Sequence, residues 1–240
     1  MVLRPALRRV RWSAATRIVA SRHPPIDLYE RVSPDPTVWE ALIAAEMLTN
    51  PRVRDEVGDI HLVPIEERVS GPGASYVMAP FTHRNPKGGR FSDADHGAYY
   101  AANDLATAVA ETSYHFGKFA ADAADGPRYE DMRVLVGRID AGLHDLATLD
   151  RAEQQRLLDP DDYSASQAFA AALRDAGSTG VHYPSVRRPG GRCVAMFRPS
   201  AVGIPVQARH LQFHWDGVRV GRYFDYEEGS WVALEPARAG

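Results

Sequence analysis

Five side chains of this sequence have types and positions that could serve chemistry: Arg31, Arg90, Tyr100, Glu111 and Ser185. Arg90 ends the run Asn85-Pro-Lys-Gly-Gly-Arg, where small neighbours would let a backbone approach a phosphate closely. The planar guanidinium group suits the oxygens of a phosphate or diphosphate. Arg90 and Arg31 are therefore candidate anion-binding residues. The alternative for each is a surface arginine in an arginine-rich chain.

Glu111 and Ser185 offer a carboxylate and a hydroxyl. Glu111 precedes His115 by four residues on an expected helix. It could form a structural pair there, or stabilise positive charge that develops on a substrate. Ser185 follows Pro184 at an expected strand end. A serine nucleophile needs a base, and the sequence shows none for Ser185. We therefore expect it to form hydrogen bonds, either to a ligand or to the nearby backbone.

Tyr100 lies on the expected strand 99–102, so its ring could stack on a ligand or pack in the core. Tyr99 must face the other side of that strand. A helix is expected to open at Asn103 or Asp104 and to run to about Ala121. This helix would carry Glu111.

The elements that hold these residues mix helices and strands without regular alternation. Helices are expected at 36–48, 104–121 and 164–176, and strands at 15–20, 76–79, 99–102, 132–139, 181–186, 193–197, 210–214 and 218–223. The pattern predicts an α+β fold, a single domain built on one mixed sheet.

Charge is distributed unevenly along the chain. The net charge is −3, yet the first 26 residues contain six arginines and no acidic residue. We expect a basic N-terminal segment at 1–25, a frayed tail that runs into the strand at 15–20, with an organellar transit peptide as the alternative. A catalytic domain at 26–225 and a C-terminal tail at 226–240 would follow. The role of residues 35–75 stays open, and the acidic remainder argues against direct nucleic-acid binding.

Composition and missing motifs exclude several classes of protein. Hydrophobic residues make up 45% and charged residues 25% of the chain, which excludes a disordered or collagen-like protein. The single cysteine, Cys193, suits a reducing cytoplasm. No apolar run is long enough for a membrane span. The sequence contains none of four common motifs: the glycine motif of the Rossmann fold, the P-loop, the nucleophile elbow of the α/β-hydrolases and the zinc-protease motif. We therefore expect neither a metal nor a resident cofactor.

Three segments together resemble the RES-domain toxins, a family named for its Arg, Glu and Ser residues. They are Ile26-Asp-Leu-Tyr-Glu-Arg-Val32, then Asn85–Ser92 with Tyr100 and Glu111–His115 behind it, and Gly180-Val-His-Tyr-Pro-Ser-Val-Arg187. A late segment, Gly190-Gly-Arg-Cys-Val-Ala-Met-Phe-Arg-Pro199, also matches. The resemblance covers about residues 20–215 and rests on the order of the pieces, since no single piece is specific.

The resemblance implies a fold related to the ADP-ribosyltransferases and a cytoplasmic toxin that degrades NAD⁺. Such a toxin cleaves the nicotinamide–ribose bond by phosphorolysis or hydrolysis, with inorganic phosphate as co-substrate in the first case, and an Xre-type antitoxin plugs its active site. Arg31 and Arg90 would hold phosphates, Glu111 would stabilise the oxocarbenium ion, and Ser185 and Tyr100 would position the nicotinamide ribose. Two alternatives stay open: a mono-ADP-ribosyltransferase that modifies a protein, and a non-catalytic domain that binds a nucleotide or a partner. A homo-oligomer is also open.

Overall fold

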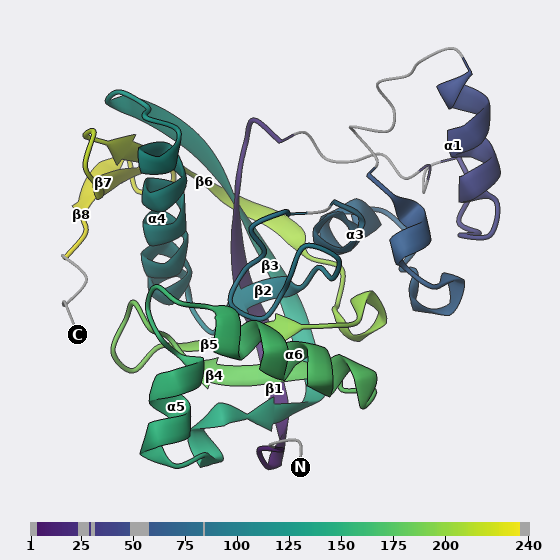
Figure 1. The fold of residues 1–240 in the computed structure, drawn as a ribbon. Coiled ribbons are helices and arrows are strands. Elements are labelled where there is room, and N and C mark those ends of the chain that lie inside the picture. Colours follow the sequence, from purple (N-terminus) through teal and green to yellow (C-terminus); the bar gives the residue numbers. More distant parts are fainter. Residues whose placement is uncertain (1–3, 24–28, 30–31, 49–57, 84, 236–240) are drawn as a thin grey trace.

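The computed structural model describes residues 4–23, 29, 32–48, 58–83 and 85–235 of the chain (Figure 1). Within these ranges the strands are β1 (Leu7–Ala20), β2 (Tyr99–Ala102), β3 (Arg128–Asp145), β4 (Gly180–Pro184), β5 (Arg192–Met196), β6 (Val206–Trp215), β7 (Val220–Asp225) and β8 (Ser230–Ala233). The α-helices are α1 (Trp39–Met47), α3 (Ala74–Thr82), α4 (Leu105–Asp122), α5 (Arg151–Leu157) and α6 (Ser164–Asp175). Short 3-10 turns occur at Ile60–Leu62, Ile65–Glu67, Leu146–Thr148 and Pro199–Ala201.

The strands form one mixed sheet in the order β1-β2-β5-β4-β3-β6-β7-β8. The β3–β4 pair is parallel, with His144 beside Val181, and the neighbouring pairs are antiparallel. Strand β1 also pairs with β3 along almost its whole length, so β1, β2, β5, β4 and β3 close into a ring. The predicted fold class, a single α+β domain on one mixed sheet, is confirmed.

Strand β1 starts at Leu7, although the sequence suggested a frayed basic tail before residue 15. The segment is ordered because its backbone pairs with β3 from Leu7 to Ala20, and its arginines also approach carboxylates of that strand. Arg9 Nε lies 2.6 Å from Asp140 Oδ1, and Arg8 Nη1 lies 3.2 Å from Asp145 Oδ2. β1 therefore belongs to the same sheet as the rest of the chain, and so does β8 beyond residue 225. The domain limits expected at residues 25 and 225 stay predictions.

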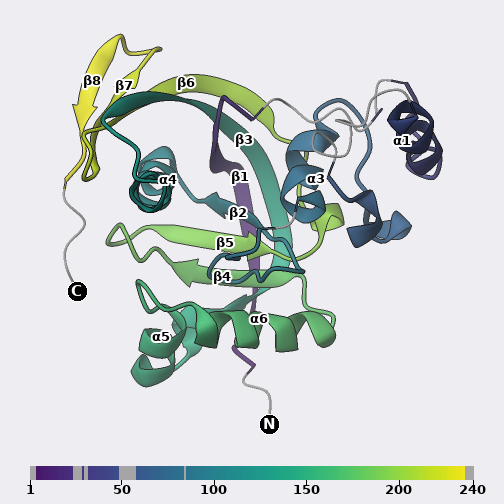
Figure 2. The ribbon, with the colours of Figure 1, turned by 45° about the horizontal axis from the view of Figure 1, so that its top comes forward.

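Two hydrophobic clusters cover the two faces of the central strands. In the first, α4 and α6 pack on the sheet, and α4 lies inside the curve of β3, β6 and β7 (Figure 2). The second contains Trp39 of α1 and Met78 of α3. Tyr99 belongs to the second cluster, whereas Tyr100 packs beside the first. The two tyrosines therefore face opposite sides of β2, as expected.

Helix α3 corrects the prediction of a short strand at 76–79. Ala74, Val77, Met78 and Phe81 are all buried, and their spacing of three to four residues is helical. Four apolar residues in a row fit a strand and a helix turn equally well. The helix forms here because it buries these apolar side chains against the second cluster.

Helix α4 begins where the sequence predicts, because the side chain of Asp104 accepts a hydrogen bond from the Thr107 amide at 2.7 Å. The helix runs to Asp122, and its spacing places Glu111, His115 and Lys118 along one side of the cylinder. All three side chains line the same cavity.

Candidate active site

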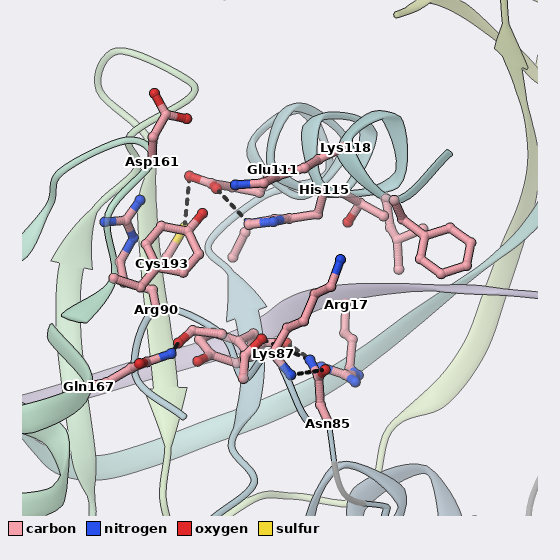
Figure 3. Close-up of a pocket in the computed structure, with 18 of the residues that line it drawn as sticks. Arg17, Asn85, Lys87, Arg90, Glu111, His115, Lys118, Asp161, Gln167 and Cys193 are labelled. Atoms are coloured by element: carbon pink, nitrogen blue, oxygen red, sulfur yellow. Dashed lines mark hydrogen bonds and ion pairs between the residues drawn. The ribbon is translucent and has the colours of Figure 1, made fainter. Parts of the chain in front are cut away.

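A cavity of about 1070 Å³ opens between α4, the ring of strands and the loop before β2 (Figure 3). Its walls come from strands β1, β2, β4 and β5, from helix α4, from the loop before β2 and from the start of α6. The lining residues outside α4 and the residue that follows it are 16–18, 85–90, 100–102, 161–164, Gln167, Tyr183 and Cys193. This volume lies just above the usual range for small-molecule sites, about 300–1,000 Å³. Three of the five residues selected from the sequence, Arg90, Tyr100 and Glu111, line this cavity, and a fourth, Ser185, forms a hydrogen bond with Glu111. The fifth, Arg31, lies outside the described residues.

Glu111 is held rigidly at the inner wall of the cavity. Its Oε1 accepts hydrogen bonds from Ser185 Oγ at 2.6 Å and from the Val186 amide at 3.1 Å, with the Arg187 amide at 3.4 Å. These donors come from the turn between β4 and β5 and fix the plane of the carboxylate. Its Oε2 lies 4.0 Å from His115 Nε2. Glu111 is therefore a positioned carboxylate on the cavity wall, in addition to its place beside His115 on the helix flank.

Ser185 bonds to Glu111 and to its own turn. Besides donating to Glu111, its Oγ accepts hydrogen bonds from the amides of Arg187 at 3.2 Å and Arg188 at 3.0 Å. The hydroxyl thus links a backbone turn to the carboxylate, which makes Ser185 a positioning residue for Glu111. A contact of Ser185 with substrate stays a prediction.

Arg90 reaches the cavity from the glycine-rich loop and is itself anchored. Its Nη1 donates to the carbonyl oxygens of Leu157 and Asp159, and its guanidinium lies 4.5 Å from the centre of the Tyr163 ring. Among the described residues, no carboxylate forms an ion pair with Arg90. An arginine that lines a cavity without a paired carboxylate is suited to bind an anion.

The sequence suggested that the backbone of the glycine-rich loop could approach a phosphate, but the amides of Gly88 and Gly89 are bonded within the loop. The amide of Gly88 donates to Asn85 O at 2.8 Å, and the amide of Gly89 donates to Ser92 O at 2.9 Å. Gly88 has a φ of 64°, a conformation that favours glycine. The glycines therefore shape a turn that presents the Arg90 side chain, and these amides are already used within it.

Tyr100 anchors that loop to the sheet. Its hydroxyl accepts a hydrogen bond from the Phe91 amide at 2.9 Å and lies 3.1 Å from Ser92 Oγ. Burial raises the pKa of Tyr100 above its ordinary value, so the phenol stays neutral at physiological pH. The ring lines the cavity, and its stacking on a ligand stays a prediction.

His115 and Cys193 complete the surroundings of Glu111. Partial burial lowers the pKa of His115, an effect that the Glu111 charge opposes and nearby cations reinforce. Burial raises the pKa of Cys193, and Glu111 raises it further. At neutral pH, His115 is therefore an unprotonated base and Cys193 a protonated thiol, unsuited to act as a nucleophile.

Sequence reasoning missed three other residues that line the cavity: Arg17, Lys118 and Tyr163. Lys118 could have been found, because it lies seven residues after Glu111 and so on the same helix face. Tyr163 immediately precedes α6, and its hydroxyl is buried without a hydrogen-bond partner in the described part of the chain. Arg17 was counted with the basic segment, and no local signal separates it from its neighbours.

The described ranges were searched for metal-ligand clusters and for membrane-spanning helices. No group of three or more His, Cys, Asp or Glu side chains in them is arranged to hold a metal ion. None of their helices combines the length and the apolar composition that a membrane crossing requires.

Comparison with known proteins finds a family model, a relative in sequence and a similar solved structure. A family model described as RES domain matches residues 65–216, a range that contains Arg90, Tyr100, Glu111 and Ser185. Uncharacterized protein y4oC of Sinorhizobium fredii (strain NBRC 101917 / NGR234) is 27% identical over 215 residues, 88% of this chain and 87% of the relative. Among solved structures, the M. tuberculosis MbcT–MbcA toxin–antitoxin complex matches with a TM-score of 0.37 and 20% sequence identity, over 55% of this chain and 74% of that chain.

Proposed function

The chain belongs to the RES domain family, and from this premise we propose that it is a toxin that degrades NAD⁺ by cleaving the nicotinamide–ribose bond. The observation that carries the proposal is the carboxylate of Glu111, fixed by the β4–β5 turn on the wall of a cavity of about 1070 Å³. The size of that cavity fits a dinucleotide. Arg90 lines the same cavity.

The proposed reaction places positive charge where Glu111 can stabilise it. The bond between the nicotinamide nitrogen and the ribose carbon breaks with its electron pair going to nitrogen, so nicotinamide leaves as a neutral molecule. The ribose carbon then carries oxocarbenium character. A carboxylate near that carbon lowers the energy of the transition state. Because three donors already fix Oε1, the carboxylate needs little reorganisation during the reaction.

A nucleophile from solution completes the proposed reaction. The Ser185 hydroxyl is engaged with Glu111 and two amides, and the Cys193 thiol is protonated. Inorganic phosphate would attack through one of its oxygens and yield a ribose phosphate ester. Water would release a proton on attack, and the unprotonated ring of His115, which lines the cavity, would accept it.

We further propose that a cognate antitoxin protein neutralises the toxin by blocking this cavity. Membership of the RES domain family supports this proposal, and so does the cavity, which a partner segment could fill. An Xre-type antitoxin is the expected partner, and the cytoplasm is the expected location.

The decisive experiment incubates the purified protein with NAD⁺, with and without inorganic phosphate, and identifies the products by mass. Free ADP-ribose would indicate hydrolysis, and its 1″-phosphate would indicate phosphorolysis. Transfer of ADP-ribose to a protein would favour the alternative of a mono-ADP-ribosyltransferase. Intact NAD⁺ under all conditions, together with undisturbed growth of expressing cells, would contradict the proposal.

Replacing Ser185 with alanine is expected to lower the rate of NAD⁺ cleavage by about tenfold and leave measurable activity. Removal of Oγ takes one hydrogen bond from Glu111, worth about 1.5 kcal/mol for a charged acceptor, while the Val186 amide still holds the carboxylate. The rate constant is measured at saturating NAD⁺. Ser178→Ala is a suitable control, because Ser178 Oγ bonds only to Gly180 among the described residues and lies outside the cavity lining. Complete loss of activity in Ser185→Ala would instead support a serine nucleophile.

A further inference from the structure

The outer face of β3, β6, β7 and β8, which is turned away from α4, carries exposed aromatic side chains (Figure 2). The inner face of these strands belongs to the first hydrophobic cluster, through residues such as Phe213 and Tyr223. An antiparallel sheet that packs on one side normally has polar residues on the other. Here Tyr129, Tyr226 and Trp231 are 54%, 51% and 42% exposed. Exposed apolar surface gathered in one place marks a contact with another molecule.

The rings on this side of the sheet form one connected group. Tyr129 of β3 packs on His214 of β6 with ring centres 4.9 Å apart, and the Trp231 ring of β8 lies 6.0 and 6.3 Å from them. Phe224 of β7 lies 5.4 Å from Trp231 and 5.2 Å from Tyr226. We call these five side chains the outer aromatic face. Tyr and Trp are enriched among the residues that contribute most to protein–protein binding, so this face has the composition of an interface centre.

Two exposed charges, Asp131 and Arg222, lie on the same side of the sheet without a partner of opposite sign. Asp131 Oδ1 accepts a hydrogen bond from Gln212 Nε2 at 2.9 Å, and the Tyr226 hydroxyl lies 3.5 Å from it. The Arg222 guanidinium lies 4.5 Å from the centre of the Trp231 ring. Neither charge forms an ion pair with a residue that the structure describes. One acidic and one basic group are therefore both open to a partner.

The strand register separates these two charges by one strand. Asp131 of β3 is the register partner of Gln212 on β6. Arg222 of β7 is the register partner of His214, two residues further along β6. The two charges therefore flank β6 and lie one row apart on the same face. A two-fold axis that runs along the interface and crosses β6 midway between them would set Asp131 of each copy opposite Arg222 of the other.

We propose that the outer aromatic face binds a second copy of this chain, in a symmetric dimer that pairs Asp131 of each copy with Arg222 of the other. This inference does not depend on the proposed function. The cavity lining contains no residue of β6, β7 or β8, so the dimer leaves the cavity open. β7 and β8 follow residues 65–216, the segment that the RES domain model matches. The face is therefore built in large part by an addition to the matched domain.

The test reverses the two charges and measures the monomer–dimer equilibrium by sedimentation velocity over a range of protein concentrations. Four short strands give a contact smaller than a standard interface, so we expect a wild-type dissociation constant on the order of 10 µM. Asp131→Arg sets two arginines against each other, and Arg222→Asp sets two carboxylates against each other. Each variant alone should therefore raise the dissociation constant by about tenfold or more.

An equimolar mixture of Asp131→Arg and Arg222→Asp provides the sharpest result. In a heterodimer of the two variants both contacts again join opposite charges, so its affinity should return close to that of the wild-type dimer. The matched controls are Asp175→Arg and Arg151→Asp, which reverse exposed charges at the end of α6 and at the start of α5. Both controls lie outside the outer aromatic face and should leave the dissociation constant unchanged.

Three outcomes would overturn the dimer. A wild-type protein that stays monomeric at every concentration would leave the outer aromatic face to a different partner. Single variants that dimerise as tightly as the wild type, or a mixture that stays as weak as its components, would show that the two charges do not pair. If circular dichroism shows that a reversal variant does not fold, Asp131→Asn and Arg222→Gln replace the pair. Each should then weaken the dimer by about threefold, and wild-type affinity in both overturns the inference.

Discussion

Glu111→Gln is expected to lower the rate of NAD⁺ cleavage by about 1000-fold. A carboxylate about 4 Å from a developing positive charge contributes on the order of 4 kcal/mol at an effective dielectric constant of about 20, and each 1.36 kcal/mol corresponds to a factor of ten in rate. Glutamine has nearly the same shape, and its amide oxygen can still accept from Ser185 Oγ and the Val186 amide. The variant therefore removes the charge and keeps the fold. Single-turnover consumption of NAD⁺ measures the effect, and relief of growth inhibition should accompany it.

The control for this variant is Glu153→Gln. Glu153 lies on α5, outside the cavity lining, and forms an ion pair with Arg156 at 2.7 Å. An exposed pair of this kind contributes little to stability, so the control should keep wild-type activity. If Glu111→Gln cleaves NAD⁺ as fast as the wild-type protein while remaining folded, the carboxylate is a structural partner of the β4–β5 turn, and the proposed mechanism is wrong.

Gly97→Ala is expected to lower the free energy of unfolding by about 3 kcal/mol, because the backbone of α3 approaches this position too closely for a side chain. A Cβ at residue 97 would lie 1.8 Å from the Pro80 carbonyl oxygen and 2.9 Å from the Phe81 Cα. Both are backbone atoms of a packed helix and cannot move aside cheaply. The Gly97 carbonyl oxygen also accepts from Arg174 Nη2 at 3.1 Å, which ties the segment to α6.

Urea unfolding followed by circular dichroism measures this loss, with Gly142→Ala as the matched control. Gly142 lies on β3, and a Cβ there would meet no atom within 4 Å. Its replacement should therefore leave the free energy of unfolding unchanged or raise it slightly. The same free energy of unfolding in Gly97→Ala and in the wild type would show that the contact between α3 and the segment before β2 relaxes easily.

Much of the local structure could be predicted because its causes are local. The Asp104 cap, the positive φ of Gly177 after α6 and the hairpin between β6 and β7 each depend on neighbouring residues. The placement of Glu111 and His115 one turn apart follows from helical spacing alone. Short apolar runs carry less information, and for this reason Tyr76–Ala79 was wrongly expected to be a strand.

The sequence by itself determined which residues were worth considering: Arg90, Tyr100 and Glu111 line one cavity, and Ser185 forms a hydrogen bond with Glu111. Only the tertiary structure decided what they do to one another. The hydrogen bond between Ser185 and Glu111 joins residues 74 positions apart in the sequence, and the one between Arg17 and Tyr100 joins residues 83 positions apart. Helix and strand periodicities extend over a few residues, whereas these contacts depend on how β1, β2 and β4 join in one ring. For the same reason the basic segment expected to be a tail is a strand, since its pairing partner β3 lies more than 100 positions away along the chain.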